Sequence, residues 1–140
     1  MVLILTSLGL VPFFVLSVFT SLEMYFGVSF DAMLVAYAGM ICSFLAGSQW
    51  GIALVNRLSS IWLFTSNLIA LMVFWGLYVQ NKVSLVLFMV CLVWCLLLDW
   101  FLFRRHIIDG DYFRLRCWVS FFALGCLCYR AFCLFVPVVP

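Results

Sequence analysis

The stretch AMLVAYAGMICSFLAGSQWGIA, residues 32–53, decides the fold, because it is uncharged and long enough to cross a bilayer as a helix. At ~100° per residue its small side chains fall on one side of that helix, with a tryptophan near the middle of that side. We predict that this side is a groove for helix packing or docking. Its residues are Gly39, Ser43, Ala46, Gly47, Trp50 and Gly51.

The predicted groove has two interpretations. Inside a bilayer, small residues at intervals of three and four let a second backbone come close, and tight packing replaces the hydrophobic drive. The first expectation is therefore that the groove packs helices of the same chain. The alternative is a docking face for a partner chain or a cofactor.

Composition assigns the whole chain to the membrane. Hydrophobic residues make up 69% of its 140 residues and charged residues only 9%, whereas soluble globular domains carry ~25% charged residues. The mean hydropathy is +1.33. A net charge of +2 gives no electrostatic basis for binding nucleic acid. We predict an all-α integral membrane protein with a single transmembrane domain over residues 1–140.

Five apolar runs, separated by polar breaks, each have about the ~20 residues that a spanning helix needs. We predict a compact bundle of five transmembrane helices with spans at about 2–22, 32–55, 61–79, 83–103 and 117–136. Pro12 is expected to kink the first span, because it removes the backbone hydrogen bond to the carbonyl of Leu8.

Positive charge predicts the orientation of the bundle. The N-terminus, the loop at Arg57 and the polar segment 104–116 share one side, which carries five arginines. The other side has Lys82 and, within the last span, Arg130. By the positive-inside rule the N-terminus lies inside and the C-terminus outside.

Asp99, near the end of the fourth span, and the arginines that follow it form the most polar cluster. Asp99 lies ~7.5 Å from Arg104 along a helix axis, so an arginine must reach down to it. We predict a buried ion pair between Asp99 and Arg114 or Arg116 across an antiparallel hairpin. The alternative is a site for an anionic lipid headgroup or a cofactor carboxylate, built from Arg104, Arg105, Arg114 and Arg116.

Patterns for catalysis or metal binding are weak. The seven cysteines lie in or beside apolar runs with no C-x-x-C, so we interpret them as small apolar fillers. His106 is the only histidine, which excludes a two-histidine zinc motif and a bis-histidine haem. Asp109 and Asp111 lack the second aspartate pair of metal-dependent lipid phosphotransferases. We expect no enzymatic activity, no metal site and no cofactor.

Two blocks resemble a known family. YAGMICSFLAGSQWG, residues 37–51, resembles the signature of the transmembrane protein 69-like family, also called domain of unknown function 3429, which is approximately Y-[small]-x-x-I-L-S-F-L-G-G-x-x-W-G. Tyr37, Ser43 and Trp50 are among the matches. Cys42 stands where the family usually has leucine, and Ala46 replaces the first of the paired glycines.

The second block is Asp99 followed by DYFRLR, in which Tyr112, Leu115 and Arg116 resemble the ending D…P-x-W-Y-x-x-L-R. Residues 109–111 occupy the stretch where a proline would be expected. The resemblance covers nearly the whole chain. It implies a compact multi-helix protein of the bacterial inner (cytoplasmic) membrane or of the mitochondrial inner membrane, and it implies no particular biochemical activity.

The scarcity of catalytic groups and the presence of a groove favour a non-enzymatic accessory subunit or assembly factor of a larger membrane complex. Its partners would be membrane lipids and other membrane protein subunits. A small-solute or proton transporter working as a homo-oligomer is the alternative, with Glu23, Asn67 and Asp99 as polar groups at different depths. Glu23 and Arg130 are an alternative ion pair near the outer surface.

Overall fold

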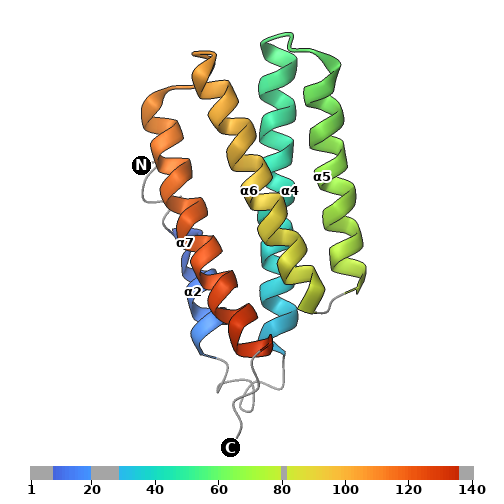
Figure 1. Cartoon of the computed structure of the whole chain (residues 1–140), viewed down its shortest axis with the longest axis vertical. Coiled ribbons are helices and arrows are strands. Elements are labelled where there is room, and N and C mark those ends of the chain that lie inside the picture. Colours follow the sequence, from blue (N-terminus) through green and yellow to red (C-terminus); the bar gives the residue numbers. More distant parts are fainter. Residues whose placement is uncertain (1–7, 20–28, 80–81, 136–140) are drawn as a thin grey trace, which may run out of the picture.

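The structure is a computed structural model that describes residues 8–19, 29–79 and 82–135. Its elements are α2 (Val11–Val18), α4 (Phe30–Val55), α5 (Ser60–Val79), α6 (Lys82–Arg104) and α7 (Gly110–Phe135). The described part of the chain holds helices and no strand, so the all-α prediction is confirmed there (Figure 1).

Four of these helices are long and apolar enough to cross a membrane, namely α4, α5, α6 and α7. They contain between 20 and 26 residues. At 1.5 Å per residue this is ~30–39 Å, which matches the ~30 Å hydrocarbon core of a bilayer. The length and hydropathy of these helices indicate a multi-pass membrane protein.

The bounds of α4, α5 and α6 lie within two residues of the predicted spans 32–55, 61–79 and 83–103. Helix α7 begins at Gly110, seven residues before the predicted start of the last span at residue 117. The N–H of Phe113 already donates to the carbonyl of Asp109, and Asp111 places a negative charge in the first turn, where the helix dipole favours it. Most of the predicted polar loop is therefore helix.

The predicted first span, 2–22, extends beyond the described residues at both ends. Its described helix, α2, has eight residues and carries Pro12 in its first turn. A proline is favourable there, since the first turn needs no intrahelical N–H. Leu8 is helical, the backbone turns at Gly9 and Leu10, and α2 starts afterwards with Pro12 in its first turn. The predicted kink of the whole first span stays a prediction, because residues 1–7 lie outside the described residues. The hydroxyl of Tyr37 donates to the carbonyl oxygen of Gly9 at 2.7 Å.

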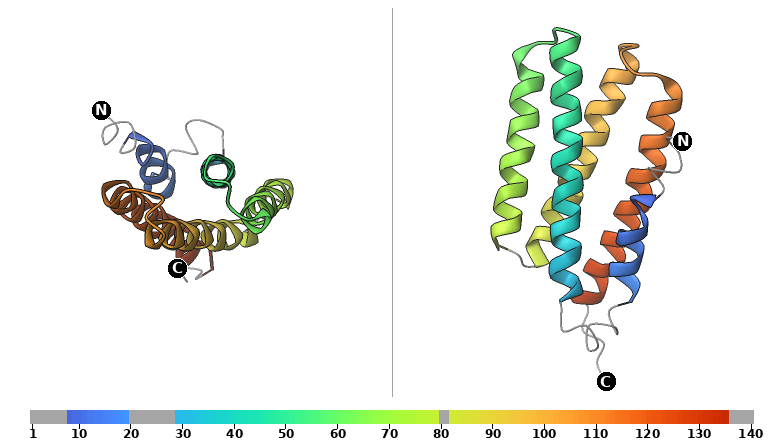
Figure 2. Two further views of the ribbon diagram at one scale, coloured as in Figure 1. Left: turned by 90° about the horizontal axis from the view of Figure 1, so that it is seen from above. Right: turned by 180° about the vertical axis from the view of Figure 1, so that it is seen from behind.

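Seen from above, α5, α6 and α7 form a curved row, and α4 packs across α5 and α6 (Figure 2). The short α2 contacts both α4 and α7. The core lies between α4 and α6, where apolar side chains and thiols are fully buried, among them Leu34, Ala38 and Cys42 of α4 and Phe88, Leu92 and Cys95 of α6.

The ring of Phe88 fixes the distance between α4, α5 and α6. A Cβ at Gly39 of α4 would lie 2.9 Å from Cδ2 of Leu77, and one at Gly76 of α5 would lie 2.6 Å from the ring of Phe88. At Gly76 a Cβ would therefore displace the ring of Phe88, whereas at Gly39 it would require the end of the flexible Leu77 side chain to shift. Gly39, from the predicted groove, packs helices of the same chain.

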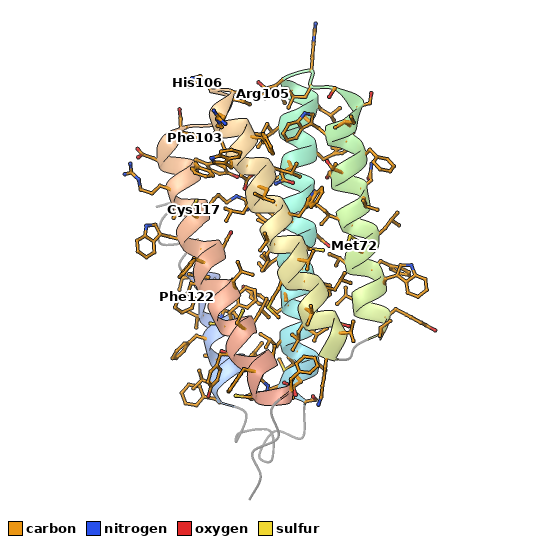
Figure 3. All side chains as sticks on the ribbon, in the orientation of Figure 1. Met72, Phe103, Arg105, His106, Cys117 and Phe122 are labelled. Atoms are coloured by element: carbon orange, nitrogen blue, oxygen red, sulfur yellow. The ribbon has the colours of Figure 1, made fainter. Side chains whose placement is uncertain are left out.

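Both loops at one end of the bundle have a left-handed residue at their second position. This residue is Arg57 (φ 49°) after α4 and His106 (φ 55°) after α6. Figure 3 labels His106 at this end of the bundle. The N–H of Leu58 donates to the carbonyl of Ala53, and the N–H of Ile107 donates to that of Leu102. These bonds are those of the Schellman motif, which satisfies carbonyls that the end of a helix leaves free.

Candidate functional site

A buried ion pair joins α6 to α7. Nε of Arg116 lies 3.1 Å from Oδ2 of Asp99, and only 9% of Arg116 and 1% of Asp99 are exposed. The two helices form an antiparallel hairpin (Figure 1), in which Phe103 and Phe113 stack with ring centroids 4.9 Å apart. This geometry brings the fifth predicted span back alongside the fourth, so that Arg116 reaches Asp99 from the neighbouring helix.

Helix α4 supplies two further side chains that the sequence analysis missed. Nε2 of Gln49 donates to the carbonyl of Cys95 at 2.8 Å and to Oδ1 of Asp99 at 3.2 Å. The guanidinium of Arg116 donates to Oγ of Ser48 at 3.3 Å. The sequence does carry a sign of this role, because Gln49 is an amide side chain in an otherwise apolar stretch. Inside a bilayer such a group needs a hydrogen-bond partner.

Two polar atoms of this cluster have no hydrogen-bond partner among the described residues. They are Oε1 of Gln49 and Nε of Arg116. Nε of Arg116 nevertheless lies 3.1 Å from Oδ2 of Asp99, so the carboxylate stabilises it electrostatically. The cluster thus keeps one buried acceptor, Oε1 of Gln49, without a hydrogen-bond partner among the described residues.

The other arginines of the predicted lipid-headgroup site are not brought to Asp99. The ring of Tyr112 lies 5.5 Å from the guanidinium of Arg116, which adds a cation–π contact to the ion pair. The remaining three have separate partners: Arg104 over the ring of Trp100 (5.1 Å), Arg105 over that of Trp62 (5.9 Å) and Arg114 beside the exposed Asp111 (3.7 Å).

A cavity of about 360 Å³ lies between α4 and α7, beside the start of α2. Its walls are almost entirely apolar and include Phe13, Ile41 and Leu92. Arg116 and Ser120 of α7 are among its few polar lining residues. The buried ion pair therefore lies in the wall of a cavity and not only in a helix interface.

A second depression, of about 240 Å³, lies between α4 and α5. Ser43, Gly47 and Trp50 of the predicted groove line it together with Ala46, and α5 adds Asn67. Nothing lies within 4 Å of the Cβ position at Gly47, nor at the half-exposed Gly51. The predicted groove is therefore divided: Gly39 packs within the chain, Ala46 is buried at the floor of the depression, and the residues from Gly47 onwards remain open.

At the opposite end of α7, Arg130 forms a two-bond ion pair with Asp31 at the start of α4. NH2 of Arg130 lies 2.9 Å from Oδ2 of Asp31. Asp31 is thus an acidic partner of Arg130, and the alternative pairing of Arg130 with Glu23 stays a prediction. Glu23 lies outside the described residues.

Comparison with protein-family models gives one match, which covers residues 1–132 and describes a protein of unknown function, DUF3429. The chain belongs to the DUF3429 family. The predicted domain family is confirmed, while the name transmembrane protein 69-like stays a prediction. No curated protein and no solved structure matches the chain.

The residues by which the sequence resembled DUF3429 have specific contacts in the structure. Tyr37 donates a hydrogen bond to the carbonyl of Gly9, Trp50 lines the depression between α4 and α5, and Asp99 forms an ion pair with Arg116. Among the described residues, no three His, Cys, Asp or Glu side chains are grouped so that they could hold a metal ion. The chemistry that this arrangement offers is packing and hydrogen bonding in a membrane.

Proposed function

We propose that this DUF3429 protein is a non-enzymatic accessory subunit or assembly factor of a larger protein complex in the bacterial or mitochondrial inner membrane. The observation that carries the proposal is the open depression between α4 and α5. It combines small residues with a polar side chain on a surface that faces away from the core.

Asn67 is the polar element of this docking face, which we define as Ser43, Gly47, Trp50, Asn67 and Ala70. Asn67 is exposed on an apolar spanning helix, and its amide has no hydrogen-bond partner among the described residues. In hydrocarbon such an amide gains roughly 0.6–2 kcal/mol from a partner on another helix. A partner helix with a polar side chain at the same depth would satisfy it.

The small residues supply the close approach. A second helix can lie against the docking face because no atom lies within 4 Å of the Cβ position at Gly47. Close backbone contact over small residues is the usual basis of helix association in a bilayer, where burial of apolar surface adds little. The docking face therefore suits a spanning helix of another membrane protein.

The test compares Gly47→Leu with Gly39→Leu, the same change on the same helix. Gly47→Leu fills open space, so we expect a folded protein with unchanged thermal stability that no longer co-purifies with its partner in mild detergent. Gly39→Leu meets Leu77 and Phe88, so we expect loss of stability before any effect on a partner can be seen.

Two outcomes contradict the proposal. One is a Gly47→Leu protein that keeps a stoichiometric partner, which would remove the docking face. The other is a purified homo-oligomer with substrate-dependent flux in liposomes and no partner, which would establish the transporter alternative. Asn67→Leu provides the second variant: it removes the amide while keeping a side chain of similar size, and we expect weaker co-purification.

We further propose that the chain has five spans, with its N-terminus inside and its C-terminus outside. The support is the distribution of arginines and lysine over the helix ends. Arg57 follows α4, and Arg104 and Arg105 lie at the end of α6, on the same side of the bundle (Figure 1). Lys82 begins α6 on the opposite side. The positive-inside rule places the first side in the cytoplasm or matrix.

A further inference from the structure

The cavity between α4 and α7 is separate from the docking face. Ile41 and Leu45 of its wall lie roughly opposite Ser43 and Gly47 on helix α4 at ~100° per residue. An inference about this cavity therefore does not rest on the proposed function. If the proposed docking function is refuted, the inference about the cavity still stands, and the reverse also holds.

Among the described residues, α2 lies beside only part of the space between α4 and α7. With eight residues α2 spans ~12 Å, whereas α4 and α7, with 26 residues each, span ~39 Å. Gly9 and Leu10, where the backbone turns into α2, contribute to the lining. Along α7 the cavity extends from Tyr112 to Ala123. Its volume of about 360 Å³ is within the range of small-molecule sites.

The cavity wall offers one strong hydrogen-bond donor in apolar surroundings. Arg116 lines it and is 9% exposed. Its Nε is fully buried against Asp99, and one of its terminal amino groups donates to Oγ of Ser48. The other N–H groups of the guanidinium have no hydrogen-bond partner among the described residues, so a molecule that brings an oxygen acceptor to them gains affinity. The apolar walls, with Phe13 and Leu92, favour a largely apolar molecule.

Charge decides which oxygen acceptor suits the site. The guanidinium of Arg116 is already balanced by Asp99, at 3.1 Å and 1% exposed. A phosphate or carboxylate headgroup at Arg116 would be repelled by this nearby carboxylate, and the low dielectric of the interior strengthens that repulsion. A neutral oxygen accepts a hydrogen bond without adding charge.

We propose that the cavity between α4 and α7 binds a neutral, apolar membrane molecule whose carbonyl or hydroxyl oxygen accepts a hydrogen bond from Arg116. Quinone heads and the esters of neutral glycerides share this chemistry. The site differs from the predicted lipid-headgroup site of four arginines, because three of those arginines are engaged elsewhere.

The experiment titrates the purified full chain in mild detergent and counts bound molecules by native mass spectrometry. The probes are decylubiquinone and dioctanoylglycerol, with dioctanoyl phosphatidic acid as the anionic counterpart. We expect one neutral probe to bind per chain, at least about tenfold more tightly than phosphatidic acid. Preference for decylubiquinone would identify a quinone as the source, and preference for dioctanoylglycerol a glyceride. Absence of binding by both neutral probes, or equal binding of phosphatidic acid, would overturn the proposal.

Variants locate the binding in this cavity. Val119→Phe places a ring in the cavity without removing a member of the ion pair, and Arg116→Lys keeps the charge beside Asp99 but loses the planar donor group. We expect each to weaken binding by about tenfold or more. Val90→Phe, the same enlargement at an exposed position of α6, should leave binding unchanged. If Arg116→Lys fails to fold, the test rests on Val119→Phe. Unaltered binding of the neutral probe to Val119→Phe would refute the proposal that the cavity between α4 and α7 is the binding site.

Discussion

At the scale of single residues, Asp99 and Arg116 form the most deeply buried ion pair among the described residues. Each is buried, and each has hydrogen-bond or ion-pair partners on two other helices. Ser48 and Gln49 of α4 extend the pair across the bundle, so that three spanning helices meet at one carboxylate and one guanidinium. The pair thus orients α4, α6 and α7 relative to one another.

Removing either charge should be strongly destabilising, because the remaining charge would be buried without its partner. We expect Asp99→Asn or Arg116→Gln to lower the free energy of unfolding by about 3–5 kcal/mol, measured by titration with a denaturing detergent in mixed micelles. The double variant should lose less than the sum of the two, since its buried groups are both neutral.

The matched control for this pair is Asp111→Asn at the exposed contact with Arg114, where both side chains are more than three-quarters exposed. It should leave the unfolding midpoint unchanged. Additive losses in the double variant, or equal losses at Asp111, would show that the buried pair is not a coupled unit.

At the scale of elements, α4 and α6 end in the same way. Both place a residue other than glycine in the left-handed region, and both use it to bond the last carbonyls. For a side chain with a Cβ this conformation costs about 1–2 kcal/mol. The two loops at this end therefore hold their shape despite local backbone strain.

Glycine at His106 should relieve this strain. We expect His106→Gly to raise the free energy of unfolding by about 1 kcal/mol or less, because the greater freedom of glycine in the unfolded chain offsets part of the gain. His106→Ala retains the Cβ and should bring no gain. A rise as large in the alanine variant would mean that the imidazole, and not the backbone, was responsible. The same mixed-micelle titration measures all three proteins.

The helix bounds show which elements the sequence can predict. The limits of α4, α5 and α6 follow from abrupt changes between apolar and polar residues. The start of α7 does not, since Asp111 and Arg114 are on its exposed side while Leu115 and Arg116 face the cavity. The composition of these first turns is that of a polar loop, because their exposed side carries the charged residues. Composition alone therefore does not reveal that they are helical.

At the scale of the whole molecule, the orientation in the membrane is the simplest property to test. In spheroplasts or mitoplasts, whose inner membrane is intact and exposed, an epitope inserted after Ser59, between α4 and α5, or after Ile108, between α6 and α7, should be inaccessible to antibody. One inserted after Val79, between α5 and α6, should be accessible. The control is the same preparation after permeabilisation of the inner membrane, in which all three should bind. The reverse pattern before permeabilisation would invert the proposed topology.

Only part of each candidate site can be predicted from the sequence. Consecutive helices joined by a short loop are antiparallel, so the sequence limits the possible partners of Asp99 to Arg114 or Arg116. The contribution of Gln49 depends on which helix packs beside the hairpin, and the spacing of residues does not encode this. The cavity likewise depends on how far α2 extends, which follows from the turn at Gly9 and Leu10.

The ion pairs of α7 also bear on how the chain enters the bilayer during its synthesis. Arg116 and Arg130 each have an acidic partner, Asp99 and Asp31, that precedes them in the chain. An arginine within a spanning helix is costly unless it is paired. Because Asp31 and Asp99 precede α7 in the chain, both carboxylates are made before the arginines that they neutralise. We therefore expect a circularly permuted chain that began with α7 to insert less well, since both arginines would enter the lipid before their partners.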